Sequence, residues 1–297
     1  MKVKSSVFLF LFVVVFTGVS SLAPARVYGQ SGSSVWKISK DGNTVFLGGS
    51  IHILRNEDFP LPEEFNRAFE ESSILVLEAN IDELSEPGVL QYLMQRMILP
   101  EGKTLQSVLN SEVYDLLKEK CAEYGIPAES VSRLKPSMVV MIISVAEIAK
   151  HGFVEQGVDA FYFEKAKETK MPVEFLETVE TQINILVAMG DGYENDFVKY
   201  SLEDMDTSLN DLLAMISAWK TGASEYTDSD LAEMQEEWPV FYKILVLDRN
   251  HAWLPLLEAY LTTEPVEFII AGVAHMHGPD GLLRLLEDRG CTVEQLK

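Results

Sequence analysis

Cysteine is nearly absent from this chain of 297 residues, which contains only Cys121 and Cys291. No Cys-x-x-Cys spacing occurs, so a zinc site built on paired thiolates is excluded. Two cysteines make no disulfide framework, and we expect two separate thiols, although an oxidising compartment would allow them to pair. The His-Glu-x-x-His motif of helix-borne zinc proteases is also missing, so a metal site must be built in another way.

Basic residues are scarce as well. The sequence has 24 Lys and Arg against 46 Asp and Glu, which gives a formal net charge of −22. Phosphate contacts need Lys and Arg, so this composition argues against nucleic acid and against an anionic membrane surface as partners. We expect a soluble protein that tolerates cationic partners.

Long apolar runs are limited to the N-terminus. Two lysines precede an uncharged run over residues 7–19, and small residues follow around Ala23-Pro24-Ala25 and at Gly29. This order is typical of a secretory signal peptide, and the run is short for a membrane span. We predict a signal peptide over residues 1–29, cleaved after Ala25 or Gly29, with an uncleaved anchor as the alternative. The mature protein would be secreted or periplasmic, without a stable membrane span.

Residues 30–297 suffice for one sizeable domain, and strand-like runs alternate with helical ones. This pattern predicts a single α/β domain with a central, mostly parallel β-sheet, flanking helices and a helical insertion. The polar stretch 225–230 is the best candidate for an internal loop, and Pro239 and Pro255 are expected to interrupt the helical run 231–261. The expected strands are 33–38, 44–47, 74–77, 172–176 and 266–271, and the main expected helices are 62–72, 87–98, 111–124, 138–149, 157–170, 179–189, 197–219 and 281–288.

Two segments far apart in the sequence share one pattern. An apolar, β-branched run is followed by Gly-x-x-His at His52 and again at His275. Each run is typical of a buried strand. Glycine lets the backbone approach a ligand closely, and open α/β sheets place their ligand sites at the carboxyl ends of strands. If the two strands are neighbours, both imidazoles point at one place, as in a metal site or an acid–base pair.

Glu78 directly follows the strand-like run 74–77 and would lie at the same edge of the sheet if that strand is parallel to the others. Two imidazoles and one carboxylate suit a divalent ion with an open water position, so His52, His275 and Glu78 are the candidate metal ligands. In zinc enzymes such an ion lowers the pKa of its water to roughly 7, which provides hydroxide at neutral pH. The alternative for Glu78 is an ordinary solvated or helix-capping acid.

The other histidines are weaker candidates. His277 would share the side of His275 if the segment were extended, and would then be a third ligand or support one; alternatively it faces solvent. His151 at a helix end fits a partner of the helix dipole, and His251 lies within a helical run. We treat the last two as ordinary structural residues.

Several short segments follow one another in an order that is characteristic of one protein family, although each segment alone is a weak signal. They are Gly49-Ser50-Ile51-His52, Glu78, Gly157-Val158-Asp159, the run 175–182, Asp248-Arg249-Asn250 and Gly272-Val273-Ala274-His275-Met276-His277-Gly278. This set resembles the TraB/GumN family, which is related to the Tiki metalloproteases and more distantly to the erythromycin esterase and ChaN-like proteins. The resemblance covers about residues 35–296.

The resemblance implies an α/β fold like that of erythromycin esterase and ChaN, in which two Gly-x-x-His strand ends meet beneath helices. It also implies a metal-dependent hydrolase, above all a peptidase that acts on a peptide or protein with a divalent ion such as Mn²⁺, Co²⁺ or Zn²⁺. His52, Glu78 and His275 match the core positions of the family. A haem-binding or small-ligand-binding envelope protein is the alternative, followed by a structural accessory with a vestigial site. The oligomeric state is not predicted.

Three further positions come from the resemblance. Arg249 matches the arginine of the family and would be catalytic, since a guanidinium can stabilise an oxyanion or hold a substrate carboxylate. The alternative is a structural ion pair with Asp159 or Glu177. These two acids also match motif positions, as additional site residues or as residues that hold the ligands in place.

Overall fold

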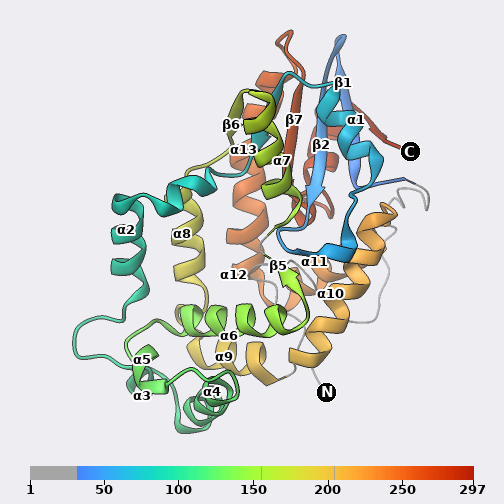
Figure 1. Cartoon of the computed structure of the whole chain (residues 1–297). Coiled ribbons are helices and arrows are strands. Elements are labelled where there is room, and N and C mark those ends of the chain that lie inside the picture. The colour runs from blue at the N-terminus through green and yellow to red at the C-terminus, as the bar shows by residue number, and fades with distance from the viewer. Residues whose placement is uncertain (1–31, 155, 204) are drawn as a thin grey trace.

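The structure is a computed structural model that describes residues 32–154, 156–203 and 205–297 (Figure 1). The predicted signal peptide lies outside these residues. A six-stranded sheet has the order β6, β4, β7, β2, β1, β8. The first four strands are mutually parallel, whereas β1 is antiparallel to β2 and β8, so the predicted α/β fold with a mostly parallel sheet is confirmed. The strands are β1 Val35–Lys40, β2 Asn43–Ser50, β4 Ile74–Leu77, β6 Val173–Phe175, β7 Glu267–Gly272 and β8 Thr292–Gln295, with a separate pair β3 Leu54–Arg55 and β5 Phe153–Val154.

The carboxyl ends of β2 and β7 lie side by side. The two strands are parallel neighbours, with Gly49 opposite Ala271 and Ser50 opposite Gly272. Every residue of β7 is buried, as expected for a central strand that is covered on both faces. This pairing brings the two Gly-x-x-His segments to one edge of the sheet.

Helices cover both faces of the sheet. Side chains alternate along a strand, so Phe268 and Ile270 of β7 belong to one apolar cluster, whereas Ile269 and Ala271 belong to another. The first cluster includes residues of α1 and α7, and the second includes residues of α13 and α14. These helices are α1 Glu63–Glu70, α7 Val158–Thr169, α13 Asp248–Tyr260 and α14 Leu282–Asp288.

The other helices gather beyond the edge at which β2 ends, below the sheet in Figure 1. Within this group α6 packs on α8 and α9, α2 on α8, and α4 on α9. Trp219 of α10 donates from Nε1 to the carbonyl of Gly49 over 2.7 Å and ties the group to the sheet. The helices are α2 Pro87–Met97, α3 Leu105–Val108, α4 Ser111–Glu123, α5 Ala128–Val131, α6 Pro136–Lys150, α8 Val179–Ala188, α9 Glu194–Glu203, α10 Met205–Lys220, α11 Glu225–Glu237 and α12 Pro239–Tyr242, with short turns η2 Asn56–Asp58 and η3 Ile81–Ser85.

Two expectations about the helices are wrong. The polar stretch 225–230 is the start of α11 rather than a loop, since acidic residues in the first turn complement the positive end of the helix dipole. Pro255 does not interrupt α13, because it faces solvent and costs only one helical hydrogen bond, at the carbonyl of the exposed His251. Pro239 does separate two helices, and Trp238 before it has an extended φ of −133°.

Cys121 and Cys291 are both buried and unpaired, as the sequence predicts. In the part of the chain that the structure describes, no helix combines the length and hydrophobicity needed to cross a membrane.

Candidate functional site

Each of the four parallel strands is followed by a polar side chain at the same edge of the sheet. His52 follows β2, Glu78 follows β4 and Glu177 follows β6. His275 follows β7 at the end of a single 3-10 turn, η5 Val273–His275. This is the edge at which parallel sheets place ligand sites, because the strand ends and the loops after them meet there.

His52 is oriented by a half-buried carboxylate. Its Nδ1 lies 3.1 Å from Oδ1 of Asp159 in the first turn of α7, and Oγ of Ser50 donates to the same oxygen over 2.7 Å. Gly157 packs so closely that a Cβ there would lie 2.3 Å from the carbonyl carbon of His52. Burial opposes a charge on the imidazole, but the carboxylates of Asp159 and then Glu78 outweigh it and raise the pKa of His52 to about 9.

His275 is oriented by a neutral partner instead. Its Nδ1 lies 2.7 Å from Oδ1 of Asn250, a fully buried residue of α13. The amide nitrogen of Asn250 donates to the carbonyls of His275 and Asp280 over 3.1 and 2.8 Å, so the amide orientation follows from its hydrogen bonds and Nδ1 of His275 carries the proton. Burial and then the charge of Arg249 lower the pKa of His275 to about 3. The ring is therefore neutral, with its lone pair on Nε2.

Arg249 of α13 is the centre of the cluster. Its Nε and Nη2 donate to the two oxygens of Glu177 over 3.1 and 2.8 Å, the bidentate geometry that guanidinium and carboxylate favour. Nη2 also donates to Oε2 of Glu78, and Nη1 lies 2.9 Å from Nε2 of His275. Because that nitrogen of His275 carries the lone pair, it accepts this hydrogen bond.

Two residues, four positions before and four positions after Arg249, hold the guanidinium in place. The carbonyl of Leu245 accepts from Nη1 of Arg249 over 3.3 Å. Leu245 belongs to a π-helical segment, η4 Lys243–Leu247, a feature that often accompanies functional sites. One turn after Arg249, the Trp253 ring lies 4.6 Å from the guanidinium carbon, and its Nε1 donates to Glu177 over 3.2 Å.

Glu78 is held from three sides. The backbone nitrogen of Gly272 donates to its Oε1 over 2.7 Å, and Gln182 donates to its Oε2 over 3.1 Å, beside the bond from Arg249. Burial opposes ionisation, but the charges of Arg249 and then His52 keep the pKa of Glu78 well below its usual range. Glu78 is therefore a buried carboxylate, not the solvated acid of the alternative interpretation.

Three of these side chains converge on Gly272. A Cβ at Gly272 would lie 3.4 Å from Oε1 of Glu78, 3.6 Å from Nε2 of His52 and 3.6 Å from Cδ2 of His275. The first two of these atoms are 3.9 Å apart. Glycine thus leaves open the space around which the two imidazoles and the carboxylate are arranged.

The model of the TraB/PrgY/gumN family matches residues 34–295 of this sequence. The chain belongs to this family. "Uncharacterized protein YbaP" of Escherichia coli strain K12 is 26% identical over 253 residues, which is 84% of this chain and 90% of that protein. "Metalloprotease TIKI1" of Xenopus tropicalis is 35% identical over 91 residues, 30% of this chain and 17% of that protein, and the human protein of the same name is 35% identical over 88 residues. No solved structure matches the chain.

The donor atoms in this TraB/PrgY/gumN chain are of the kinds that divalent cations bind, namely imidazole nitrogens and carboxylate oxygens. The carboxylate of Asp159 holds Nδ1 of one imidazole and the amide of Asn250 that of the other, so Nε2 is the nitrogen of each ring that would bind a metal. With His52 neutral, the three carboxylates and one guanidinium of the cluster carry two net negative charges, which a divalent cation balances. Among the described residues, no group of three or more His, Cys, Asp and Glu has the arrangement of a metal site. Arg249 instead takes up the facing atoms of Glu78 and His275.

His277 makes its contacts elsewhere. The segment after β7 forms a 3-10 turn, so the extended geometry that would place His277 on the side of His275 is absent. The ring packs edge-on against Trp36 with 5.4 Å between ring centroids, and the residue is buried, so the alternative that it faces solvent is wrong.

The two remaining histidines lie in the elements predicted for them, His151 at a helix end and His251 within a helix. His151 ends α6, and its Nε2 lies 3.1 Å from Oε1 of Glu147 one turn earlier. His251 is an exposed residue of α13. None of the cluster contacts described above involves either ring.

Three residues of the site are not predicted from the sequence, namely Asn250, Trp253 and Gln182. Trp253 had a usable signal, because side chains four residues apart on a helix are neighbours and Arg249 was already a candidate. Asn250 and Gln182 had none beyond their places within the family motifs, since their roles depend on how α13 and α8 are rotated against the sheet.

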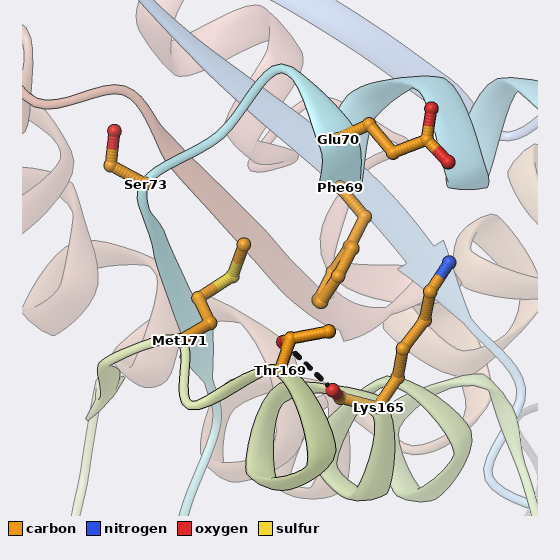
Figure 2. A pocket seen from close by; sticks show the side chains of 6 residues that line it. All are labelled: Phe69, Glu70, Ser73, Lys165, Thr169 and Met171. Atoms are coloured by element: carbon orange, nitrogen blue, oxygen red, sulfur yellow. Dashed lines mark hydrogen bonds between the residues drawn. The ribbon is translucent and has the colours of Figure 1, made fainter.

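A separate hollow lies near the amino end of β4, whereas Glu78 follows its carboxyl end. Lys165 lies 4.8 Å from the centre of the Phe69 ring there. The hollow has a volume of 380 Å³ (Figure 2), and its lining residues are Phe69, Glu70, Ser73, Lys165, Thr169 and Met171. It contains no imidazole and plays no part in the cluster described above.

Proposed function

We propose that this protein is an exported metal-dependent hydrolase that cleaves peptide bonds, with a divalent cation such as Mn²⁺, Co²⁺ or Zn²⁺ held by His52, His275 and Glu78. One observation carries the proposal. Two imidazoles from neighbouring strand ends, each anchored through Nδ1, and one buried carboxylate converge on the space at Gly272.

A cation bound there would polarise a scissile carbonyl and lower the pKa of a bound water. The remaining side chains have roles that follow from their contacts. Asp159 and Asn250 orient the two imidazoles, and Glu177 and Trp253 position Arg249. The guanidinium is then able to stabilise a developing oxyanion or to hold a carboxylate of the substrate.

The substrate class rests on similarity alone. The 35% identity to "Metalloprotease TIKI1" supports a peptide or protein as substrate, and it concerns about a third of this chain. The acidic composition of the protein favours cationic over anionic peptides, since opposite charges attract during encounter.

The test is a peptide-library assay of the mature chain with Mn²⁺, Co²⁺ or Zn²⁺, with and without a chelator. We expect cleavage that the chelator abolishes, and a loss of about a hundredfold or more for His52→Ala and His275→Ala. His251→Ala is the matched control, since that histidine is exposed on α13, outside the cluster contacts. Cleavage that is indifferent to chelator and to His52→Ala would refute the proposal.

Export is proposed from the apolar run over residues 7–19, which precedes the described residues. The N-terminus of protein recovered from outside the cytoplasm should begin after Ala25 or Gly29, as read by mass spectrometry. The haem-binding alternative and the likeness to erythromycin esterase and ChaN stay predictions. A Soret shift on haemin addition that His275→Ala abolishes would favour haem binding.

A further inference from the structure

Nε2 of His275 has one lone pair, and Arg249 already uses it. Asn250 fixes the proton on Nδ1, so Nε2 is the only nitrogen of this ring that can bind a cation. The same atom accepts a hydrogen bond from Nη1 of Arg249 over 2.9 Å. A lone pair cannot serve both partners at once.

Glu78 faces the same competition. Its Oε1 is taken by the backbone nitrogen of Gly272, and its Oε2 accepts from Gln182 and from Nη2 of Arg249. The guanidinium therefore covers one atom of each of two candidate ligands. It also supplies the positive charge that these buried carboxylates need when no cation is present.

We propose that Arg249 and a divalent cation exclude one another at His275 and Glu78, so that the arginine holds the place of the cation and must move off His275 when the site is loaded. This inference rests on the proposed function, because it takes the cation of that proposal as the competitor. It adds two states of the site, one closed by arginine and one loaded.

Two contacts of Arg249 would hold its guanidinium near the site in the loaded state. The hydrogen bond from Nε to Glu177 and the packing of the guanidinium carbon against Trp253 do not use Nη1, the atom that faces His275. They keep the guanidinium tethered while Nη1 is released. Loading thus frees a donor next to the cation, at the place where a substrate oxygen would arrive.

The first experiment measures cation affinity by competition with a chromophoric chelator, using Zn²⁺ and Mn²⁺. We expect Arg249→Met to bind the cation roughly tenfold to a hundredfold more tightly than the wild type. The substitution removes the guanidinium, which donates one hydrogen bond to His275 and one to Glu78 and so competes with the cation. Arg289→Met is the matched control, because its guanidinium pairs with Glu258 at the surface. It should bind as the wild type does.

Arg249→Met also leaves the buried Glu177 without its cationic partner, which threatens folding. The double variant Arg249→Met/Glu177→Gln removes one charge of each sign. It should fold, as checked by circular dichroism, and it should bind the cation more tightly than the wild type does.

A second readout uses the wild type itself. On addition of Zn²⁺, the ¹⁵N signals of the Arg249 guanidinium and of Nε2 of His275 should both shift, whereas Arg289 should not respond.

The outcomes separate the two proposals. Equal affinities of the wild type and the Arg249 variants, or an Arg249 signal that Zn²⁺ leaves unmoved, would overturn the place-holder role while leaving the hydrolase intact. Tighter binding by the variants with no peptide cleavage by any form would leave the place-holder role and refute the hydrolase. If neither the wild type nor the folded variants bind a cation, both proposals fall.

Discussion

At the residue scale, the two histidines occupy equivalent positions but have opposite charge states. An anionic carboxylate faces Nδ1 of His52 and favours its proton, whereas a neutral amide faces Nδ1 of His275. Burial, and then the charge of Arg249, outweigh the attraction of Glu78 at His275, lower its pKa and keep the ring neutral. In the absence of a cation, the site therefore contains one imidazolium and one imidazole.

Replacing Asp159 by Asn should remove the charge of His52. The pKa of His52 is about 9 in the folded chain and 6.5 in an unfolded one, so its contribution to stability is complete below pH 6.5 and is lost as the pH rises through 9. The loss should be on the order of 1 kcal/mol, because His52 is still partly open to solvent and water screens the pair. Urea unfolding of chelator-treated protein at pH 6 and pH 9.5 should show a loss of stability that is larger in the wild type than in Asp159→Asn by this amount. An equal loss in both would contradict the assignment.

Replacing Gly272 by Ala tests the open space directly. The new Cβ would lie 3.4–3.6 Å from the three converging side chains, which is ordinary contact, and the φ of −49° suits alanine. We expect stability within about 1 kcal/mol of the wild type, because no backbone strain arises. Zn²⁺ affinity by chelator competition should nevertheless fall, since the methyl group fills the space. Unchanged affinity in a folded variant would place the cation elsewhere.

At the scale of elements, the sequence predicts the site residues that follow the strands but not those that lie on the helices. Buried parallel strands are visible as apolar runs, so the residue after each run, such as His52 or Glu78, can be placed at one edge of the sheet. The helical partners cannot be placed in this way. Asn250 lies over His275 only because α13 packs on the sheet with one particular rotation, which depends on its apolar residues and on those of α14. The polar stretch 225–230 misleads for the same reason, since composition does not show that α11 buries part of it.

The junction between β2 and α7 is the element contact on which His52 depends. Gly157 lies against the backbone of His52, and a Cβ there would come within 2.3 Å of backbone atoms that cannot move aside cheaply. Gly157→Ala should therefore cost more than about 2 kcal/mol of unfolding free energy and lower cation affinity. Gly88→Ala is the matched control, because nothing lies within 4 Å of a Cβ at that helical position. It should be neutral or slightly stabilising in the same urea titration.

At the scale of the whole molecule, charge is distributed unevenly between the two edges of the sheet. At the carboxyl edge Arg249 pairs with the buried Glu78 and Glu177, whereas Glu267 at the amino end of β7 is buried with no such cationic partner in the described residues, and its Oε2 accepts no hydrogen bond there. Burial, and then the neighbouring Glu174, raise the pKa of Glu267 to about 7. The free energy of unfolding should therefore depend on whether the Glu267 carboxyl group is protonated.

The pKa of Glu267 determines how the free energy of unfolding changes with pH. The folded chain holds the proton of Glu267 up to about pH 7, whereas an unfolded chain releases it near 4.5, so the wild type should lose stability as the pH rises from 4.5 to 7. The loss should be on the order of 2 kcal/mol. Glu267→Gln keeps the neutral form at every pH and should be more stable than the wild type at pH 8 but not at pH 4.5, as measured by urea unfolding. Glu264→Gln, at an exposed site in the preceding turn, should follow the wild type at both values. If Glu267→Gln were as stable as the wild type at both pH values, Glu267 would have to be ionised in the folded protein at pH 8. That would require a cationic or water-filled surrounding at the amino end of β7.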